Sequence, residues 1–396
     1  MNVTITPSPL CGEVDAIASK SYAHRMIIAA ALCSEPTKIF LNTTSEDIEA
    51  TIGCIKTLGA DVIKENGAII VKPITTVCQN PVLDCCESGS TARFLLPVAA
   101  VLCDNFTMIG KGRLPHRPFT PLTEQMKLFG TKIDSDSLPM NVSEKLVGGD
   151  YKIAGNISSQ YITGLLFALP LCSKKSTITL TTELESSAYV DITIEVLKKF
   201  GVEIEKTDYG FSINPQKFTS PGKITIEGDW SNAAFWIAAD EICGNVKING
   251  MNYDSIQGDK RILEDKKSIE IDAREIPDLV PILSVIALAR KGRTKIFNAE
   301  RLRIKESDRL TAICKSLGAL GADIEELSDG LIINGTGTLK GGVCDGFNDH
   351  RIVMSAAIAS LISTDNVTIK GAEAVNKSYP RFFDDFKALG GKIIIE

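Results

Sequence analysis

The chain of 396 residues has few aromatic and imidazole side chains. Phenylalanine, tyrosine and tryptophan make up 6% of it, and there are three histidines. Hydrophobic residues still reach 44% and charged residues 23%, so the sequence predicts a globular protein with mostly aliphatic cores. The three histidines, His24, His116 and His350, lie far apart in the sequence, which is not a metal-ligand spacing. The length permits two domains of ordinary size, each with its own core.

Blocks of lysine and arginine are also missing. The net charge is -6, which argues against nucleic acid or an anionic membrane as a general partner. The longest apolar runs, FLLPVAAVLC and LLFALPLC, are too short to span a membrane, and MNVTITPSPLCGEV does not resemble a signal peptide. Eleven cysteines occur without a C-x-x-C pair, which indicates core thiols in a reducing compartment. We therefore expect a cytoplasmic protein without membrane or nucleic-acid partners.

Several sequence motifs of well-known site types are absent. The chain has no G-x-x-x-x-G-K-[ST], no G-x-G-x-x-G, no H-E-x-x-H and no G-x-S-x-G. Their absence argues against a P-loop, a dinucleotide fingerprint, a zinc protease helix and a serine hydrolase elbow. Any chemistry must come from a different arrangement of side chains.

An internal repeat organises the chain. Six segments each begin with a polar residue that is followed by a small-residue-rich apolar run of helical length, and they start near Ser21, Ser90, Ser159, Asn232, Asp278 and Asp349. The spacings between these starts are 69, 69, 73, 46 and 71 residues. Such a period predicts repetition of one supersecondary unit.

A second set of segments alternates with the first. Each has a helix end, a glycine and an alternating strand, as in KTLGADVIKENGAIIV and KKFGVEIEKTDYGFSI. The copy expected near RILEDKKSIEID lacks the glycine, so we expect a shortened unit there. Three units precede and three follow residue 222, which predicts two similar halves with a crossover at TSPGKIT, residues 219–225.

The predicted helix starts carry cations, hydroxyls and one isolated acid. Unpaired backbone N–H groups and the helix dipole make such starts suitable for phosphate and carboxylate. The alternative for each serine or aspartate is a simple N-cap, worth about 1 kcal/mol. Arg25 and Arg93, however, lie one turn inside apolar helices, where a buried guanidinium needs a partner. The proline-rich basic loop at 110–122 is either a solvated connection or a segment that closes over an anion.

The charged stretch AERLRIKESDRL, residues 299–310, alternates cations with Leu302 and Ile304. This alternation predicts a strand, with Ser307 as the cap of a following helix. A strand would place Arg301, Arg303 and Lys305 on one face, where they repel each other unless an anion or acid faces them.

Taken together, these motifs resemble the 5-enolpyruvylshikimate-3-phosphate synthase family nearly from end to end. The resemblance rests on nine ordered motifs: SKSYAHR, ESGSTARF, RLPHRP, SSQY, SSAYVDIT, EIPD, RIKESDRL, NDHR and NKSYPRFF. It implies an α/β fold of two similar domains, each an inside-out α/β barrel of three βαβαββ units, with the active site in the cleft between the domains. It also implies a discontinuous first domain of residues 1–13 and 225–396 and a second domain of residues 14–224, with crossovers near 12–16 and 222–227.

The resemblance further implies the reaction. The enolpyruvyl group of phosphoenolpyruvate is transferred to the 5-hydroxyl of shikimate 3-phosphate, with release of phosphate through a tetrahedral intermediate. The chain would then be a transferase of aromatic amino-acid biosynthesis that needs no cofactor and no metal. Its partners would be the two small-molecule substrates, and it would act as a monomer.

Site residues follow from the resemblance by position. The catalytic set is Asp278, as base toward the hydroxyl, with Glu306 and Lys20 as alternatives for protonating the methylene carbon. Shikimate 3-phosphate is assigned to Lys20, Ser21, Arg25, Ser158, Ser159, Gln160, Ser186, Tyr189, Asp278, Arg301 and Lys305. Phosphoenolpyruvate is assigned to Lys20, Gly89, Arg93, Arg117, Gln160, Arg309, Arg351 and Lys377.

Two alternatives remain at this point. The related transferase that acts on UDP-N-acetylglucosamine uses a cysteine in a mobile loop, whereas the loop GRLPHRPFT here has none. A non-catalytic anion-binding protein on the same fold would keep the cations without the acids, but Asp278 and Glu306 are both present.

Overall fold

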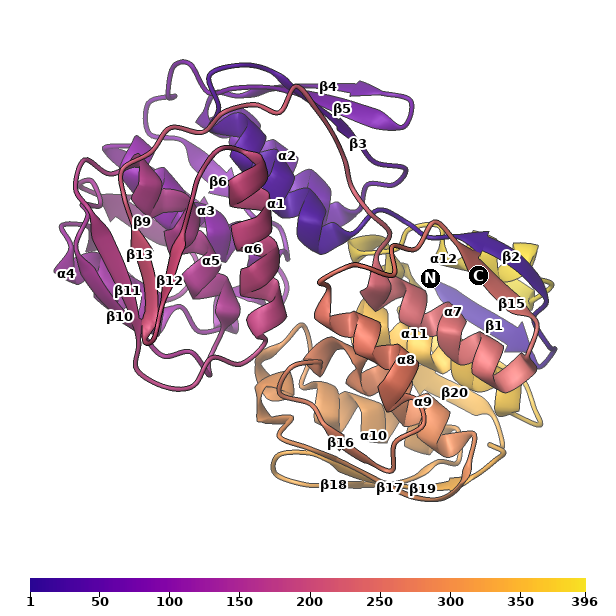
Figure 1. Cartoon of the computed structure of the whole chain (residues 1–396). Coiled ribbons are helices and arrows are strands. Elements are labelled where there is room, and N and C mark those ends of the chain that lie inside the picture. Colours follow the sequence, from indigo (N-terminus) through magenta and orange to yellow (C-terminus); the bar gives the residue numbers. More distant parts are fainter. The chain divides into compact units, whose positions relative to one another are not determined.

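The computed structural model describes residues 1–396, and the chain forms two compact units (Figure 1). The continuous unit is Lys20–Ile226. The discontinuous unit joins Met1–Ser19 to Glu227–Glu396.

The continuous unit contains three copies of one α/β pattern. Its helices are α1 (Lys20–Ala31), α2 (Glu46–Leu58), α3 (Gly89–Leu102), α4 (Thr120–Leu128), α5 (Ser159–Ala168) and α6 (Ser187–Lys199), with the 3-10 helices η1 (Leu114–His116) and η2 (Leu169–Leu171). Its strands are β3 (Thr37–Phe40), β4 (Asp61–Glu65), β5 (Ala68–Lys72), β6 (Val82–Asp84), β7 (Asn105–Ile109), β8 (Lys132–Ile133), β9 (Met140–Ser143), β10 (Asp150–Ile153), β11 (Ser176–Leu180), β12 (Glu205–Thr207), β13 (Gly210–Ile213) and β14 (Lys223–Thr225).

The three sheets of this unit have the same strand arrangement. Their orders are β14-β3-β5-β4, β6-β7-β9-β8 and β10-β11-β13-β12. In each sheet the first two strands are parallel and the remaining pairs are antiparallel. A helix joins each parallel pair that is consecutive in sequence, because parallel strands need a long crossover connection.

The discontinuous unit repeats the pattern with one shortened copy. Its helices are α7 (Trp230–Cys243), α8 (Ile262–Asp265), α9 (Val280–Leu288), α10 (Arg309–Ala319), α11 (His350–Ala359) and α12 (Phe382–Ala388), with η3 (Gly258–Arg261), η4 (Pro277–Leu279), η5 (Glu300–Ile304), η6 (Ser360–Ile362) and η7 (Ala372–Lys377). Its strands are β1 (Asn2–Thr6), β2 (Gly12–Asp15), β15 (Val246–Asn249), β16 (Glu270–Asp272), β17 (Lys291–Phe297), β18 (Asp323–Glu326), β19 (Leu331–Thr336), β20 (Gly342–Asp345), β21 (Val367–Lys370) and β22 (Lys392–Ile395).

Two of its sheets have four strands, in the orders β16-β17-β19-β18 and β20-β21-β1-β22. The third has only β15 and β2, which are parallel. The expected shortened unit is therefore present, and it explains the spacing of 46 residues. Strand β1 lies between β21 and β22 and pairs with both in antiparallel register, so the first residues of the chain complete a sheet formed by the last ones.

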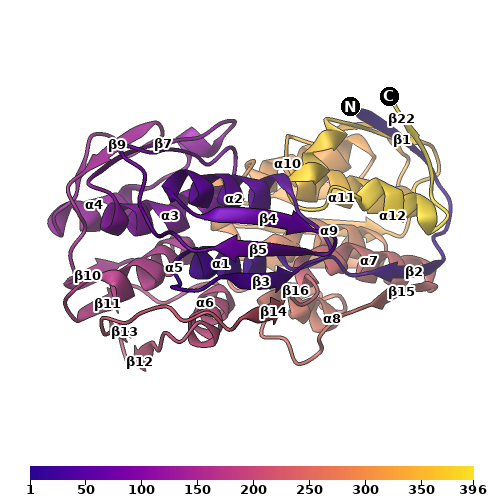
Figure 2. The same ribbon diagram turned by 90° about the horizontal axis from the view of Figure 1, so that it is seen from above.

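Within each unit the helices lie inside and the sheets outside (Figures 1 and 2). Helices α3 and α5 of the continuous unit pack against each other, and almost every residue of both is buried. In the discontinuous unit α7, α9 and α11 pack together in the same way. The reason is compositional, since these helices are apolar on nearly all sides, which lets them bury every side. The sheets remain separate rather than joined in a closed barrel.

The predicted helix starts agree with the structure to within a few residues, whereas one predicted strand is wrong. Residues 300–304 form the 3-10 helix η5 and not an alternating strand. The alternation of Leu302 and Ile304 is misleading there because Leu302 is buried while Ile304 is exposed. The predicted cap is also wrong, because Asp308 rather than Ser307 accepts from the backbone N–H of Thr311 at the start of α10.

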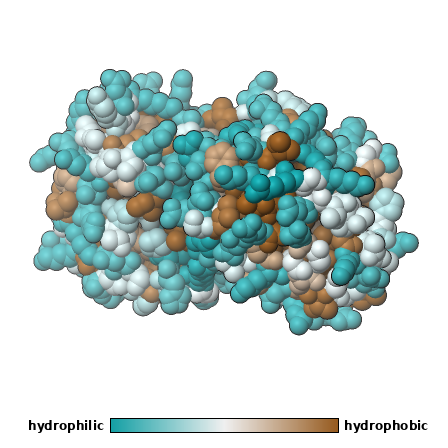
Figure 3. Space-filling model, turned by 90° about the horizontal axis from the view of Figure 1, so that it is seen from below, coloured by the Kyte–Doolittle hydropathy of each residue, from teal (hydrophilic) through white to brown (hydrophobic).

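Hydrophilic side chains cover most of the face drawn in Figure 3, with apolar side chains in small groups among them. None of the helices is both long enough and apolar enough to cross a bilayer.

Candidate functional site

The start of α1 places Lys20 beside an acid. Its Nζ lies 2.7 Å from Oδ2 of Asp47 in the first turn of α2, and the two side chains are only 16% and 13% exposed. A pair this shielded keeps more of its Coulomb energy than a surface pair does. The sequence did not identify Asp47, although the S-E-D start of α2 is a recognisable cap, with Ser45 as the N-cap residue.

Arg25 is a buried cation held by neutral groups. Its Nε donates to Thr193 at 2.8 Å, and its Nη atoms donate to the carbonyls of Ser21 at 2.8 Å and Tyr189 at 2.9 Å. The guanidinium also lies 4.8 Å from the ring centroid of Phe94. Burial lowers the pKa of Arg25 to about 10, so it stays charged at neutral pH. The expectation that this arginine needs partners is confirmed.

The start of α3 faces two guanidinium groups. A Cβ on Gly89, the first residue of the helix, would lie 2.6 Å from Nη1 of Arg117 and 3.0 Å from Nη1 of Arg93. Only a glycine lets both cations approach this helix start so closely. Since unpaired backbone N–H groups occur here as well, the arrangement suits a small anion.

Arg93 is fixed by groups on α5 and on the basic loop. Arg93 donates to Oε1 of Gln160 at 2.8 Å and to the carbonyl of Pro118 at 3.1 Å. Tyr161 donates to the same carbonyl at 2.6 Å. Pro118 follows Arg117 directly, so these bonds hold the end of the basic loop against α3 and α5, and Arg117 is buried.

A buried chain of hydrogen bonds links α1, α2 and α3. Nδ1 of His24 lies 2.7 Å from the hydroxyl of Thr51, which lies 2.6 Å from that of Thr91, which donates to Ser88 at 2.8 Å. Ser88 is the N-cap of α3, next to Gly89. Burial, with Lys20 and Arg25 nearby, lowers the pKa of His24 well below its ordinary value. His24 is therefore a neutral residue with a structural role.

Four further predicted residues lie at the starts of α5 and α6. Ser158 caps α5 by accepting from the backbone N–H of Gln160, and Ser159 is the first residue of that helix. Ser186 precedes α6 with φ 55° and ψ 44°, a left-handed conformation that is uncommon for serine. Tyr189 donates its backbone N–H to the carbonyl of Ser186 and accepts from Arg25 through its own carbonyl.

In the discontinuous unit Arg309 binds three acids. This first residue of α10 is 1% exposed, and it donates to Asp278 at 2.7 Å, to Glu306 at 2.7 Å and to Asp349 at 2.8 Å. Burial opposes its charge, but Asp349, Glu306 and Asp278 outweigh that effect and raise the pKa of Arg309. Asp349 is also the N-cap of α11, so one arginine joins three segments.

Asp278 is surrounded by cations. Its Oδ1 accepts from Arg309 and lies 3.5 Å from Nζ of Lys305, while its Oδ2 accepts from Arg351 at 3.1 Å. The carboxylate is oriented through both oxygens but remains 18% exposed, which leaves it open to a ligand. Burial is the main cause that lowers the pKa of Lys305, and the nearby Arg309 and Arg301 lower it further. Asp278 and Glu306 raise the pKa, but their effect is smaller.

The other cations near this cluster in the sequence or the structure are of two kinds. Lys377 is buried and donates to the carbonyl of Asn348, next to Asp349, so it belongs with the cluster around Arg309. Arg301 donates to the carbonyl of Arg274 and lies near enough to Lys305 to affect its pKa. Arg303, by contrast, pairs with Asp308 and Glu326, which is a structural role at the end of η5.

The structure adds two residues that had no role assigned from the sequence. Asp349 stood at a predicted helix start but had no assigned role. Asp259 lies in Q-G-D, within the shortened unit, where neither a motif nor a repeat position marks it. It is buried, and burial together with the charge of Asp278 raises its pKa to about 6.

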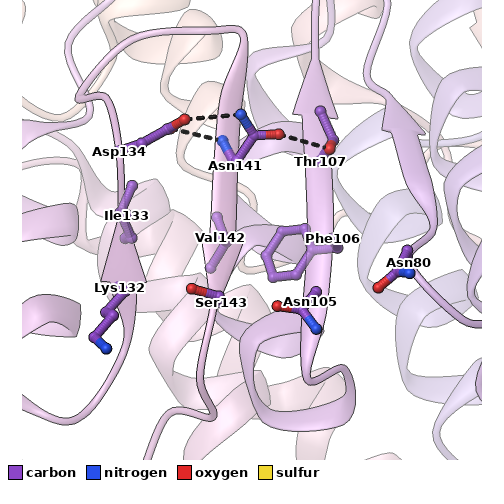
Figure 4. A pocket seen from close by; sticks show the side chains of 10 residues that line it. All are labelled: Asn80, Asn105, Phe106, Thr107, Lys132, Ile133, Asp134, Asn141, Val142 and Ser143. Atoms are coloured by element: carbon purple, nitrogen blue, oxygen red, sulfur yellow. Dashed lines mark hydrogen bonds between the residues drawn. The ribbon is translucent and has the colours of Figure 1, made fainter.

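A separate hollow of about 410 Å³ lies over the sheet β6-β7-β9-β8 (Figure 4). Its polar groups bond to one another, since Asn141 donates to Asp134 at 2.7 Å and accepts from Thr107 at 2.8 Å. It lacks the converging cations and acids of the two clusters above, so we do not assign the function to it.

The fold matches that of solved structures of EPSP synthase. A structure of EPSP synthase from Acinetobacter baumannii superposes with a TM-score of 0.82 over 100% of both chains, at 22% sequence identity. This likeness shows the two-domain inside-out α/β fold that the sequence predicted.

Sequence comparisons then show the family. The family model for EPSP synthase (3-phosphoshikimate 1-carboxyvinyltransferase) matches residues 5–268 and 263–386. Proteins named 3-phosphoshikimate 1-carboxyvinyltransferase from Clostridium novyi and Clostridium acetobutylicum are 44% and 43% identical, each over 99% of this chain and 98% of its own length. The chain belongs to the EPSP synthase family, and neither alternative weighed from the sequence is favoured.

Proposed function

We propose that the chain is a transferase that moves the enolpyruvyl group of phosphoenolpyruvate to the 5-hydroxyl of shikimate 3-phosphate and releases phosphate. The observation that carries the proposal is the cluster around Arg309, because it orients two partly exposed carboxylates, Asp278 and Glu306, among cations. Such a cluster supplies both acid–base groups and countercharges, and this reaction needs both.

The substrates are anions, and the two clusters provide the charges to bind them. Gly89, Arg93 and Arg117 at the start of α3 suit the phosphate or carboxylate of phosphoenolpyruvate. We assign the same substrate to Lys20, Gln160, Arg309, Arg351 and Lys377. Shikimate 3-phosphate is assigned to Lys20, Ser21, Arg25, Ser158, Ser159, Gln160, Ser186, Tyr189, Asp278, Arg301 and Lys305.

Proton transfer is assigned to carboxylates and one amine. Asp278 takes the proton of the 5-hydroxyl while the oxygen of that hydroxyl bonds to C2 of phosphoenolpyruvate. C3 of phosphoenolpyruvate receives a proton from Glu306 or Lys20. Phosphate then leaves C2, and C3 returns a proton to the group that supplied it, Glu306 or Lys20, which restores the double bond. Glu306 and Lys20 are both held in ion pairs, with Arg309 and with Asp47 respectively, so both side chains are already oriented. Lys20 carries its proton as an ammonium group, whereas Glu306 must first take up a proton.

The test is release of phosphate from phosphoenolpyruvate that depends on shikimate 3-phosphate. We expect Asp278→Asn and Glu306→Gln to lower kcat by about 10²- to 10⁴-fold, the usual contribution of a positioned acid or base. Glu300→Gln is a matched control in the same segment, because Glu300 is exposed on η5 and has no assigned role. We expect its kcat to equal that of the wild type.

Two further measurements in the same assay test the need for a metal and the identity of the acceptor substrate. We expect EDTA to leave the rate unchanged, since the proposed chemistry uses side chains of the chain alone. UDP-N-acetylglucosamine should not replace shikimate 3-phosphate. Turnover with that sugar nucleotide, or no turnover with shikimate 3-phosphate, would contradict the proposal.

We also propose that the protein acts in the cytoplasm as a monomer. The chain passes between the two compact units after residue 19 and after residue 226. We take these units as the two domains, each of three repeat units, that the resemblance placed at residues 1–13 with 225–396 and at residues 14–224. Size-exclusion chromatography with light scattering tests the monomer, and a mass near 42.7 kDa is the expected result.

A further inference from the structure

The shortened repeat unit brings an additional acid to the cluster around Arg309. Asp259 is the second residue of η3, which follows the two-stranded sheet β15-β2 where the other units continue into a second pair of strands. Its side chain is buried. Because a buried carboxylate is costly unless it is bonded, the position needs a physical reason.

A hydroxyl links Asp259 to Arg351. Nη2 of Arg351 donates to Oγ of Ser231 at 2.7 Å, so the single proton of that hydroxyl is available for another acceptor. The Ser231 side chain donates to the carboxylate of Asp259. Nη2 of Arg351 also donates to Oδ2 of Asp278 at 3.1 Å. The series therefore runs from Asp259 through Ser231 and Arg351 to the proposed base.

The segment that carries Asp259 is fixed independently of the cluster. Gln257 accepts from Ser19 at 3.2 Å and from the backbone N–H of Trp230 at 3.1 Å, and it donates to Glu227 at 2.6 Å. Ser255 donates to Glu227 as well. These bonds tie the residues before η3 to the start of α7, where Ser231 lies, so Asp259 and Ser231 are held together.

We propose that Asp259, acting through Ser231, is a positioning residue that orients Arg351 toward Asp278 and toward the incoming phosphoenolpyruvate. The inference rests on the proposed function and extends it to a residue that touches neither substrate. The charge state of Asp259 then affects substrate binding, because an ionised Asp259 adds to the negative charge already carried by Asp278. A protonated Asp259 keeps its oxygens for Ser231 but no longer repels an anion bound by Arg351.

The charged groups facing Asp259 come from several elements. Asp278 on η4 and Asp229 at the cap of α7 raise its pKa, while Arg351 on α11 and the Ser231 hydroxyl lower it. With a pKa raised to about 6, Asp259 is mostly protonated below that pH and mostly ionised at pH 7.5. The KM for phosphoenolpyruvate should therefore rise across this interval in the wild type.

The experiment measures kcat and KM for phosphoenolpyruvate from pH 5.5 to 8 in the whole enzyme. Asp259→Ala and Ser231→Ala should each raise KM about tenfold, the effect of losing one hydrogen bond to a charged group, with kcat changed less than about twofold. Asp259→Asn should keep the wild-type KM of pH 5.5 and lose most of the rise toward pH 8. Titration of the substrate's own phosphate affects all variants equally, so the comparison between variants isolates Asp259.

Asp265→Asn is the matched control. Asp265 is a second buried acid, six residues further along at the end of α8, and it pairs with Arg261 rather than with the cluster. A KM and pH profile equal to wild type in this variant, beside changed values in the three others, supports the inference. Wild-type behaviour of all Asp259 and Ser231 variants, or an equal change in Asp265→Asn, would overturn it. An inactive wild type would instead overturn the proposed function and this inference with it.

Discussion

At the residue scale, the candidate site depends on close approach between charged groups that the fold holds in place. Gly89 allows two guanidinium groups to reach one helix start, and Arg309 binds three carboxylates with its fixed set of donors. In both cases the identity of one residue determines how several others are arranged. Substitutions here test the geometry without removing an acid or base.

Gly89→Ala should weaken substrate binding while leaving the protein stable. The new Cβ meets the far end of Arg117, a flexible side chain that can move away, so the expected result is a several-fold higher KM for phosphoenolpyruvate with a normal melting temperature. Gly53→Ala is the control, because Gly53 is helical and has no atom within 4 Å of the position of an added Cβ. An unchanged KM for Gly89→Ala would show that Arg117 does not need this space.

Arg309→Lys should reduce stability and activity together. Lysine keeps the charge but cannot bind Asp278, Glu306 and Asp349 at once, and a buried acid without its partner costs about 3 kcal/mol. The free energy of unfolding in urea measures the loss, and the phosphate-release assay measures kcat. Arg261→Lys, at a 41% exposed arginine, should change the unfolding free energy by less than about 0.5 kcal/mol.

Asp259 should make stability depend on pH in a defined direction. Its pKa is raised from 3.8 to about 6 in the folded state, so the native protein binds more protons than the unfolded chain between these values. Stability therefore falls as pH rises through this interval. Relative to Asp259→Asn, the wild type should lose on the order of 1–2 kcal/mol between pH 5 and pH 7. Urea unfolding of both proteins at the two pH values measures it, and an equal pH dependence would contradict the assignment.

At the element scale, helices that are buried on all sides position the polar groups. Asp47, Thr51 and Cys54 follow each other at helical spacing on one face of α2, and Asp47 and Thr51 contact Lys20 and His24 of α1. The same face reaches α3 through Thr91. The polar chain thus sets the positions of three helix starts relative to one another.

Thr51→Val should break this chain at nearly constant volume. His24 and Thr91 then each lose a buried hydrogen-bond partner, so the expected loss is about 1–3 kcal/mol of unfolding free energy. Thr57→Val on the exposed face of α2 is the matched control, because the hydroxyl of Thr57 bonds only to the carbonyl of Gly53 within its own helix. If both variants are equally stable, the chain does not contribute to stability.

At the scale of the whole molecule, the two units differ in how the chain builds them. The continuous unit takes all its strands from residues 37–225, whereas the discontinuous unit takes β1 and β2 from the first residues and the rest from after 227. Strand β1 is central in its sheet, with β21 and β22 on its two sides. One unit is therefore a single stretch of chain and the other is not.

A fragment of residues 20–226 should fold alone and unfold cooperatively, since it contains complete sheets and a buried core.

Removing residues 1–10 from the full chain should instead open the sheet β20-β21-β1-β22, because β21 and β22 do not pair with each other. Hydrogen exchange followed by mass spectrometry measures both. Faster exchange is expected in the discontinuous unit of the truncated chain, and unchanged exchange in α1, α3 and α5. A disordered 20–226 fragment would contradict the first expectation.

The sequence by itself determined the repeat, the fold class, the family and the starts of the buried helices. The repeat and the helix starts follow from local signals, namely apolar runs, cap residues and glycine, which act over a few neighbouring residues, whereas the fold class and the family follow from the resemblance of nine ordered motifs to a known family. The strand predicted from the sequence at residues 300–304 was wrong, because the apparent alternation belongs to a 3-10 helix. Whether Leu302 and its neighbours are buried there depends on packing against distant residues. The tertiary structure alone decided that Asp47 pairs with Lys20, that Arg309 joins three acids, and that Asp259 reaches Arg351 through Ser231. Contacts between groups tens of residues apart leave no local pattern, so only the folded chain reveals them.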